Sequence, residues 1–214
     1  TVLFDRLGIF NHGGGRFHRV HMTDEDLDIF ARRSLFVVTN PGSNSKLASG
    51  IARLTEMCEK GIPVAIGTDG PASNNCLDMF REMFLATALQ KLRTNNAAAM
   101  DAYEVLRMAC VNGAHAMGLS DCDMLAPGKL ADLVLIDLHQ PNMQPLNNIA
   151  KNLVYSGSKQ NVRLTMVNGK SSTRTAGSTS ANPPNPSTPT PTRSWNAWQG
   201  LRGPGPPLGG APHG

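Results

Sequence analysis

The sequence lacks any run of 18 apolar residues, so no segment is expected to span a membrane. It also lacks a Cys-x-x-Cys pair: its four cysteines are scattered along the chain, and a disulfide framework is not expected. Scattered cysteines are typical of reduced thiols, which indicates a cytoplasmic protein. No stripe of basic residues with interleaved aromatics is present, and this argues against a nucleic-acid partner.

Acidic residues and lysine are absent from residues 171–214, which instead hold nine of the 15 prolines and both tryptophans. A segment of this composition cannot bury enough apolar surface to fold, so we predict a disordered tail. Three of the 20 basic residues lie in it, and the rest of the chain is therefore nearly neutral. The formal net charge of +4 consequently says little about binding partners.

The first 125 residues alternate short apolar strands with helices. Strands are predicted over 17–21, 35–39 and 63–68, and helices over 24–33, 51–60, 77–92 and 102–117. Strands that alternate with helices are parallel, and active residues gather at their carboxyl ends. Asn40 and Asp69 follow such strands, whereas His18 lies inside its strand and could point into a barrel mouth.

The pattern changes after Gly128, where three further strands are predicted over 131–138, 152–155 and 162–167. These strands indicate a small β-layer separate from the barrel strands. We therefore predict an α/β domain over 1–125, a partial β-sandwich over 126–170 and a tail over 171–214.

Asp69 is the strongest candidate for chemistry, because it leaves an apolar strand and enters a loop of small residues. Such a carboxylate can bind a metal and accept a proton from its water, or it can cap the next helix. Ser73 could likewise cap a helix that begins near Leu77. His18 and His21 are three residues apart, so on a regular strand they face opposite ways and only one is expected to enter a site.

Several separated blocks resemble the amidohydrolase superfamily. Residues 38–50 read Val-Thr-Asn-Pro-Gly-Ser-Asn-Ser-Lys-Leu-Ala-Ser-Gly, similar to its Asn-Pro-x-Ser-Asn-x-Lys-Leu-x-x-Gly block. Residues 67–75, Gly-Thr-Asp-Gly-Pro-Ala-Ser-Asn-Asn, and 77–83, Leu-Asp-Met-Phe-Arg-Glu-Met, resemble the branch of 5-methylthioadenosine/S-adenosylhomocysteine deaminases and chlorohydrolase-like enzymes. Residues 126–134 are similar to the stretch that returns the family's chain to its β-sandwich.

This resemblance implies an α/β fold: strands six to eight of a (β/α)₈ TIM-type barrel, plus part of a small β-sandwich. It gives His18 the strand-six role near the hydrolytic water, with His21 as a less essential companion. Asp69 takes the strand-eight role of metal ligand, and Ser73 would contact the substrate base. The family usually has histidine where Thr39 stands. The implied reaction deaminates a purine nucleoside-like substrate with one divalent metal, zinc being the expected ion.

Strands one to five of the family's barrel have no counterpart in this sequence, which starts at Thr1. We therefore expect the N-terminal half to be missing, together with three metal ligands and the catalytic glutamate. Such a fragment should be inactive alone, although its parent could be a homo-oligomer. Other amidohydrolase chemistry, as in a chlorohydrolase or a guanine or cytosine deaminase, stays open. So does a non-catalytic interaction protein that uses the Pro-x-x-Pro spacing of residues 183–193.

The tail has a further explanation in its coding. Family members commonly follow Asn-Gly-Lys with a run like Ile-Leu-Tyr-Glu-Asp-Gly. One coding of that run, read one nucleotide late, encodes Ser-Ser-Thr-Arg-Thr-Ala, which is the sequence of residues 171–176. We therefore predict that residues 171–214 are an out-of-frame translation and that the β-layer lacks its final strand.

Overall fold

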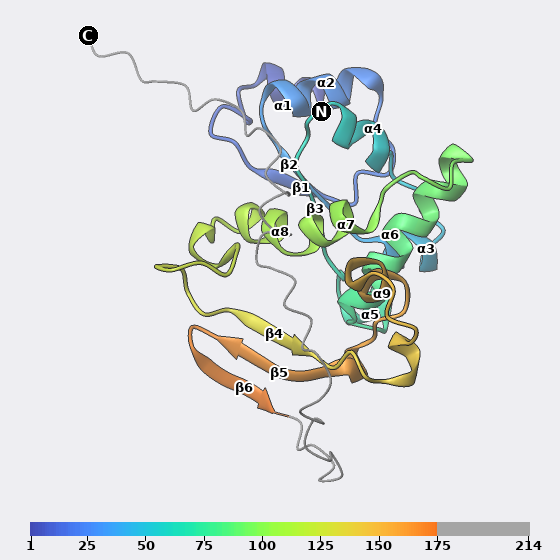
Figure 1. Ribbon diagram of the computed structural model, residues 1–214. Helices are drawn as coiled ribbons and strands as arrows, with labels where there is room; N and C mark the ends of the chain where they lie inside the picture. The colour runs from blue at the N-terminus through green and yellow to red at the C-terminus, as the bar shows by residue number, and fades with distance from the viewer. Residues whose placement is uncertain (175–214) are drawn as a thin grey trace, which may run out of the picture. The chain divides into compact units, whose positions relative to one another are not determined.

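A three-stranded parallel sheet forms the centre of the α/β part of the chain, in a computed structural model that describes residues 1–174 (Figure 1). Its strands are β1 (Gly15–Phe17), β2 (Phe36–Thr39) and β3 (Val64–Ile66), in that order. Phe17 pairs with Val38, and Thr39 pairs with Ile66. All three residues of β3 are buried, as expected of a parallel strand covered on both faces.

Helices connect and cover these strands. Before β3 lie α1 (Val2–Arg6), α2 (Asp24–Arg32), α3 (Pro41–Lys46) and α4 (Leu54–Glu59); after it come α5 (Pro71–Asn74), α6 (Met79–Thr94), α7 (Ala102–Ala109) and α8 (Val111–Ala116). The predicted capping box is confirmed at α2, where the Thr23 hydroxyl accepts the Asp26 N–H. The core packs side chains of α2, α4 and α7 against the sheet, among them Leu27, Phe30, Val37, Met57, Val64 and Val105.

Two predicted elements in this part end earlier than predicted, and a third ends where it was predicted to end. The first strand ends at Phe17, because His18 and Arg19 adopt left-handed backbone angles with φ of 66° and 46°. The strand predicted over 35–39 does end at Thr39, and Pro41 then occupies the first turn of α3, where its missing N–H costs nothing. The helix predicted over 102–117 breaks at Cys110, whose φ and ψ are −105° and −76°.

The second sheet is antiparallel and orders β4 (Leu133–Ile136), β5 (Val162–Val167) and β6 (Lys170–Arg174). Its connections include α9 (Ile149–Tyr155) and three-residue helical turns at Pro141–Met143 and Lys159–Asn161; another such turn, Ser120–Cys122, precedes β4. The strand predicted over 152–155 is therefore wrong. Ala150 and Val154 are both buried, four residues apart, which is the spacing of one helix face.

β6 also corrects the predicted tail boundary and the predicted absence of a final strand. Asn168 and Gly169 form a two-residue turn with φ of 48° and 73°, the geometry that joins tightly paired strands. Residues 170–174 then pair with β5 through the backbone, which side-chain composition does not prevent. The rest of the predicted disordered, out-of-frame tail lies outside the described residues.

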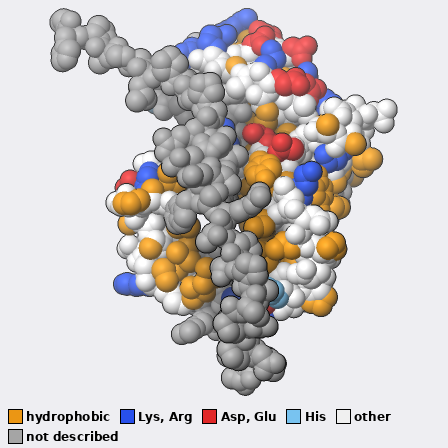
Figure 2. All heavy atoms as spheres, in the orientation of Figure 1, with side chains coloured by type: hydrophobic (Ala, Val, Ile, Leu, Met, Phe, Trp, Pro, Cys, Tyr) orange, Lys and Arg blue, Asp and Glu red, His pale blue; other side chains and the backbone are white. Residues whose placement is uncertain are grey.

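Large apolar side chains remain on the surface of this second sheet. Val134, Leu135 and Val167 are each about half exposed, and Figure 2 shows hydrophobic side chains on this surface. Val134 and Leu135 are consecutive in β4, so apolar side chains are exposed on both faces of this sheet. Within residues 1–174, no helix is both long and apolar enough to cross a membrane.

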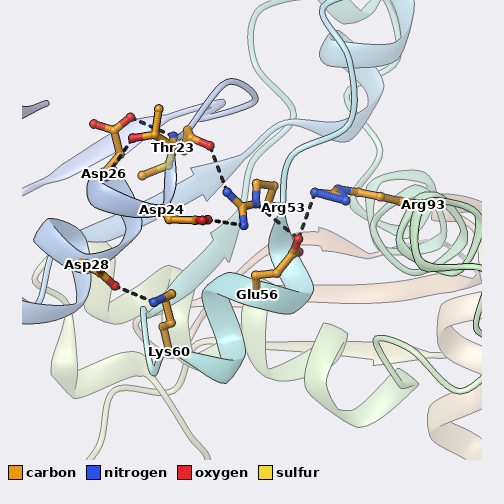
Figure 3. Close-up of polar contacts among 9 residues, drawn as sticks. Thr23, Asp24, Asp26, Asp28, Arg53, Glu56, Lys60 and Arg93 are labelled. Atoms are coloured by element: carbon orange, nitrogen blue, oxygen red, sulfur yellow. Dashed lines mark hydrogen bonds and ion pairs between the residues drawn. The ribbon is translucent and has the colours of Figure 1, made fainter.

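An ion-pair network joins α2, α4 and α6 (Figure 3). The Arg53 guanidinium contacts Asp24 at 2.7 Å and Glu56 at 3.3 Å, and Arg93 contacts the same Glu56 oxygen at 3.0 Å. Arg53 also donates to the backbone carbonyl of Met22. The network therefore fixes the segment between α3 and α4 against the start of α2.

Candidate active site

His18 stands at the carboxyl end of β1, one residue beyond the strand. Its backbone N–H still donates to the Val38 carbonyl at 2.9 Å, which keeps it in register with β2. Its left-handed φ turns the side chain out of the strand pattern, an unusual conformation for a residue with a Cβ. The Nδ1 atom lies 2.9 Å from Asn44 Oδ1. An amide oxygen can only accept, so Nδ1 is the donor in this contact.

Asp69 lies three residues beyond β3 and also has a left-handed φ, of 61°. Its Oδ2 atom accepts the hydroxyls of Ser43 and Ser73, each at 2.6 Å. The Ser43 hydroxyl, the Ser73 hydroxyl and the Gly70 backbone lower the pKa of Asp69 to about 2. The side chain is therefore a carboxylate at neutral pH. It does not cap the next helix, because the N-cap of α5 is Gly70 and no side-chain capping bond is present there.

His18 and Asp69 face one another across the end of the sheet. His18 Nε2 is 3.8 Å from Asp69 Oδ2, too long for a hydrogen bond. The two side chains are 42% and 31% exposed, so both can be reached from solvent. The structure thus brings together the two residues that the sequence singled out, at the carboxyl ends of parallel strands.

The sequence did not predict that α3 would orient these two side chains. Ser43 donates to Asp69 and Asn44 contacts His18, so two successive residues of one short helix orient both members of the pair. Both are almost fully buried, at 1% and 3% exposed. The available signal was their place in the Asn-Pro-Gly-Ser-Asn block directly after a strand, at the end where parallel-sheet sites gather.

The other candidate residues take different places. Ser73 lies inside α5 and points to Asp69, and it does not cap α6, whose N-cap is Asp78. Thr39, at the position where the family usually has histidine, is 1% exposed at the end of β2. His21 is exposed and lies beside Gly50.

The donor set fits a metal only in part. Asp69 is an ionised carboxylate, a suitable zinc ligand, and the His18 imidazole stands beside it. Catalytic zinc sites use about three protein ligands. In the described part of the chain, no group of three or more His, Cys, Asp or Glu side chains converges. Residues 1–174 therefore do not by themselves offer the ligand set of a catalytic zinc site.

A carboxylate and an imidazole meet at the carboxyl ends of β3 and β1, the strands on either side of β2, and enzymes built on parallel strands and helices place their active sites at this end. The chain belongs to the amidohydrolase family, whose model matches residues 6–171. It is 46% identical over 166 residues to a 5-methylthioadenosine/S-adenosylhomocysteine deaminase of Desulfitobacterium hafniense, covering 78% of this chain and 38% of the relative.

Solved structures agree with this assignment. An adenosine deaminase from Xanthomonas campestris with bound zinc superposes with a TM-score of 0.76 at 37% identity, over 79% of this chain and 39% of that one. The zinc complex of the atrazine chlorohydrolase TrzN from Arthrobacter aurescens gives a TM-score of 0.71 at 25% identity, over 75% and 36%. The chain thus spans about two fifths of the length of the relatives it matches.

Proposed function

We propose that this chain is the C-terminal part of a zinc-dependent aminohydrolase that deaminates a purine nucleoside of the 5-methylthioadenosine or S-adenosylhomocysteine type. The observation that supports this most is the 3.8 Å approach of His18 Nε2 to an Asp69 carboxylate already held by two hydroxyls. In this proposal β1, β2 and β3 are strands six, seven and eight of a (β/α)₈ barrel. Residues 1–125 are its barrel part and 126–170 part of a β-sandwich.

Asp69 has two roles in the proposed reaction. Its carboxylate is one ligand of the zinc, which when bound would supply an activated water. The same group accepts the proton that this water gives up. A carboxylate with a pKa of about 2 is a weak base, so the proton rests on it only briefly before passing to the leaving amine. The two serine hydroxyls keep the carboxylate ionised and fix its direction.

His18 orients the water and the tetrahedral carbon that forms at the amine-bearing ring position. Its Nδ1 donates to Asn44, which fixes the direction of the ring and leaves Nε2 as the atom that meets the water. Nε2 and the carboxylate are close enough for one group beside them to contact both. Ser73 would exchange its bond to Asp69 for a contact with the substrate base.

The first test compares this chain alone with the same chain joined to a segment that supplies the other metal ligands. Alone, the 214-residue chain should release no ammonia from 5-methylthioadenosine and should bind zinc weakly in calorimetry. Joined to an N-terminal half that supplies the other ligands, it should deaminate this substrate. Asp69→Ala should then lower the rate by several orders of magnitude, since a ligand and a proton acceptor are lost together.

Asp28→Ala is the matched control, because Asp28 is an exposed aspartate that pairs with Lys60 away from the site. Turnover by the chain alone that disappears in Asp69→Ala would overturn the fragment proposal. A joined enzyme that removes chloride from a triazine but leaves 5-methylthioadenosine intact would instead favour the chlorohydrolase alternative, which the superposition on TrzN motivates. Guanine and cytosine in the same substrate panel test the remaining deaminase alternatives.

A further inference from the structure

Glu82 is a buried carboxylate to which the proposed reaction assigns no role. It lies in the first turn of α6 and is 0% exposed. Burying such a group costs free energy unless its oxygens are hydrogen-bonded. Oε2 accepts the backbone N–H of Gly42 at 2.7 Å, and Oε1 accepts the Asn74 amide at 2.8 Å. Both oxygens of the buried carboxylate thus have a donor.

The two donors come from the two segments that orient His18 and Asp69. Gly42 precedes Ser43 and Asn44 in α3, the residues that contact Asp69 and His18 respectively. Asn74 follows Ser73 in α5 and also donates to the Thr68 carbonyl at 2.6 Å, directly before Asp69. Glu82 therefore joins α3 to α5. Its donor in α3, Gly42, is 40 positions away in the sequence, and its donor in α5, Asn74, is eight positions away.

Gly42 makes this contact possible. A Cβ atom added there would lie 2.3 Å from Glu82 Oε1 and 3.0 Å from Asn74 Nδ2. A distance of 2.3 Å is far inside van der Waals contact, so any larger residue must displace the carboxylate or the loop. The Glu82 carboxylate thus occupies the space that a side chain at position 42 would need.

We propose that Glu82 is a positioning residue for the active site: it sets the place of α3 against α5, and through them the geometry of the His18–Asp69 pair. The inference rests on the proposed function for its relevance to catalysis, but not for its geometry. Glu82 touches neither His18 nor Asp69, so its effect on them passes through Gly42 and Asn74. Only an acceptor at both oxygens satisfies both donors.

The test uses ¹⁵N-labelled 214-residue chain and needs no activity. Ring ¹⁵N shifts of His18 are recorded well above the ordinary histidine pKa of about 6.5, where they report which nitrogen holds the proton. Amide hydrogen exchange is measured at Gly42 in the same samples. The variants are Glu82→Gln, which replaces one acceptor oxygen by a donor, and Gly42→Ala, which displaces the carboxylate. Glu59→Gln makes the same chemical change at an exposed glutamate.

The wild type and Glu59→Gln should show the proton on Nδ1 and a protected Gly42 amide. Glu82→Gln should populate the other tautomer and exchange the Gly42 amide about tenfold faster, as expected for a lost hydrogen bond to a carboxylate. Gly42→Ala should change the His18 signature in the same direction. Folded Glu82→Gln with an unchanged His18 signature overturns the proposal. Global unfolding of both variants also overturns it, because Glu82 would then be a general stability residue. The deamination assay is separate, so failure there leaves this result intact.

Discussion

Replacing Ser43 with alanine tests the electrostatics of the site most directly. The Ser43 hydroxyl is the largest cause of the lowered pKa of Asp69, ahead of Ser73 and the Gly70 backbone. Losing it should raise the pKa of Asp69 from about 2 toward the ordinary 3.8, by about one pH unit. The carboxyl ¹³C shift of Asp69, followed from pH 6 down to about pH 1.5 in the 214-residue chain, measures this directly.

The same shift has a consequence for stability. A lowered folded-state pKa contributes stability above the unfolded value of 3.8, and this contribution is lost as the pH falls through about 2. The difference corresponds to roughly 2 kcal/mol at face value, which solvent screening of this partly exposed side chain reduces to ~1 kcal/mol. In Ser43→Ala the folded and unfolded pKa values of Asp69 should differ by less. The unfolding free energy of this variant should therefore fall by less when the pH is lowered.

Ser45→Ala is the control, since Ser45 belongs to the same helix but donates to the Pro41 carbonyl. It should leave the Asp69 titration unchanged. An unchanged Asp69 pKa in folded Ser43→Ala would refute the reasoning, and so would equal changes in the two variants. Ser73→Ala should act in the same direction as Ser43→Ala with a smaller effect.

Three further outcomes are expected. The isolated chain should associate in sedimentation experiments, because the second sheet exposes apolar side chains and the edges of the parallel sheet are unpaired within residues 1–174; a cooperative monomeric unfolding transition would contradict this. Arg53→Gln should lower the unfolding free energy by ~0.5–1 kcal/mol at low salt and by less at high salt, whereas exposed Arg81→Gln should have little effect; equal effects would argue against the ion-pair network. Resequencing the coding DNA should reveal a frame change close to residue 171. An intact frame, with the same tail in relatives, would contradict this and would favour the Pro-rich segment as a binding segment.

Particular residues show why prediction succeeded in some places and failed in others. The helix at 24–32 was predictable because its capping box and apolar spacing are local signals. The segment 149–155 was misjudged as a strand at 152–155, because a short apolar run has no decisive period without knowledge of what buries it. β6 was missed because composition was weighed above the Asn-Gly turn that precedes it.

The sequence by itself determined that Asp69 would follow a parallel strand and that His18 would belong to another one, since the βα alternation and the family blocks are properties of short segments. Only the tertiary structure decided that these two side chains stand 3.8 Å apart and that Ser43 and Asn44 orient them. Those contacts join residues 26 positions apart in the sequence, and they depend on the register of β1, β2 and β3. The buried Glu82 depends on the same register, because its donors meet only when α3 and α5 pack against α6. No local pattern encodes that meeting.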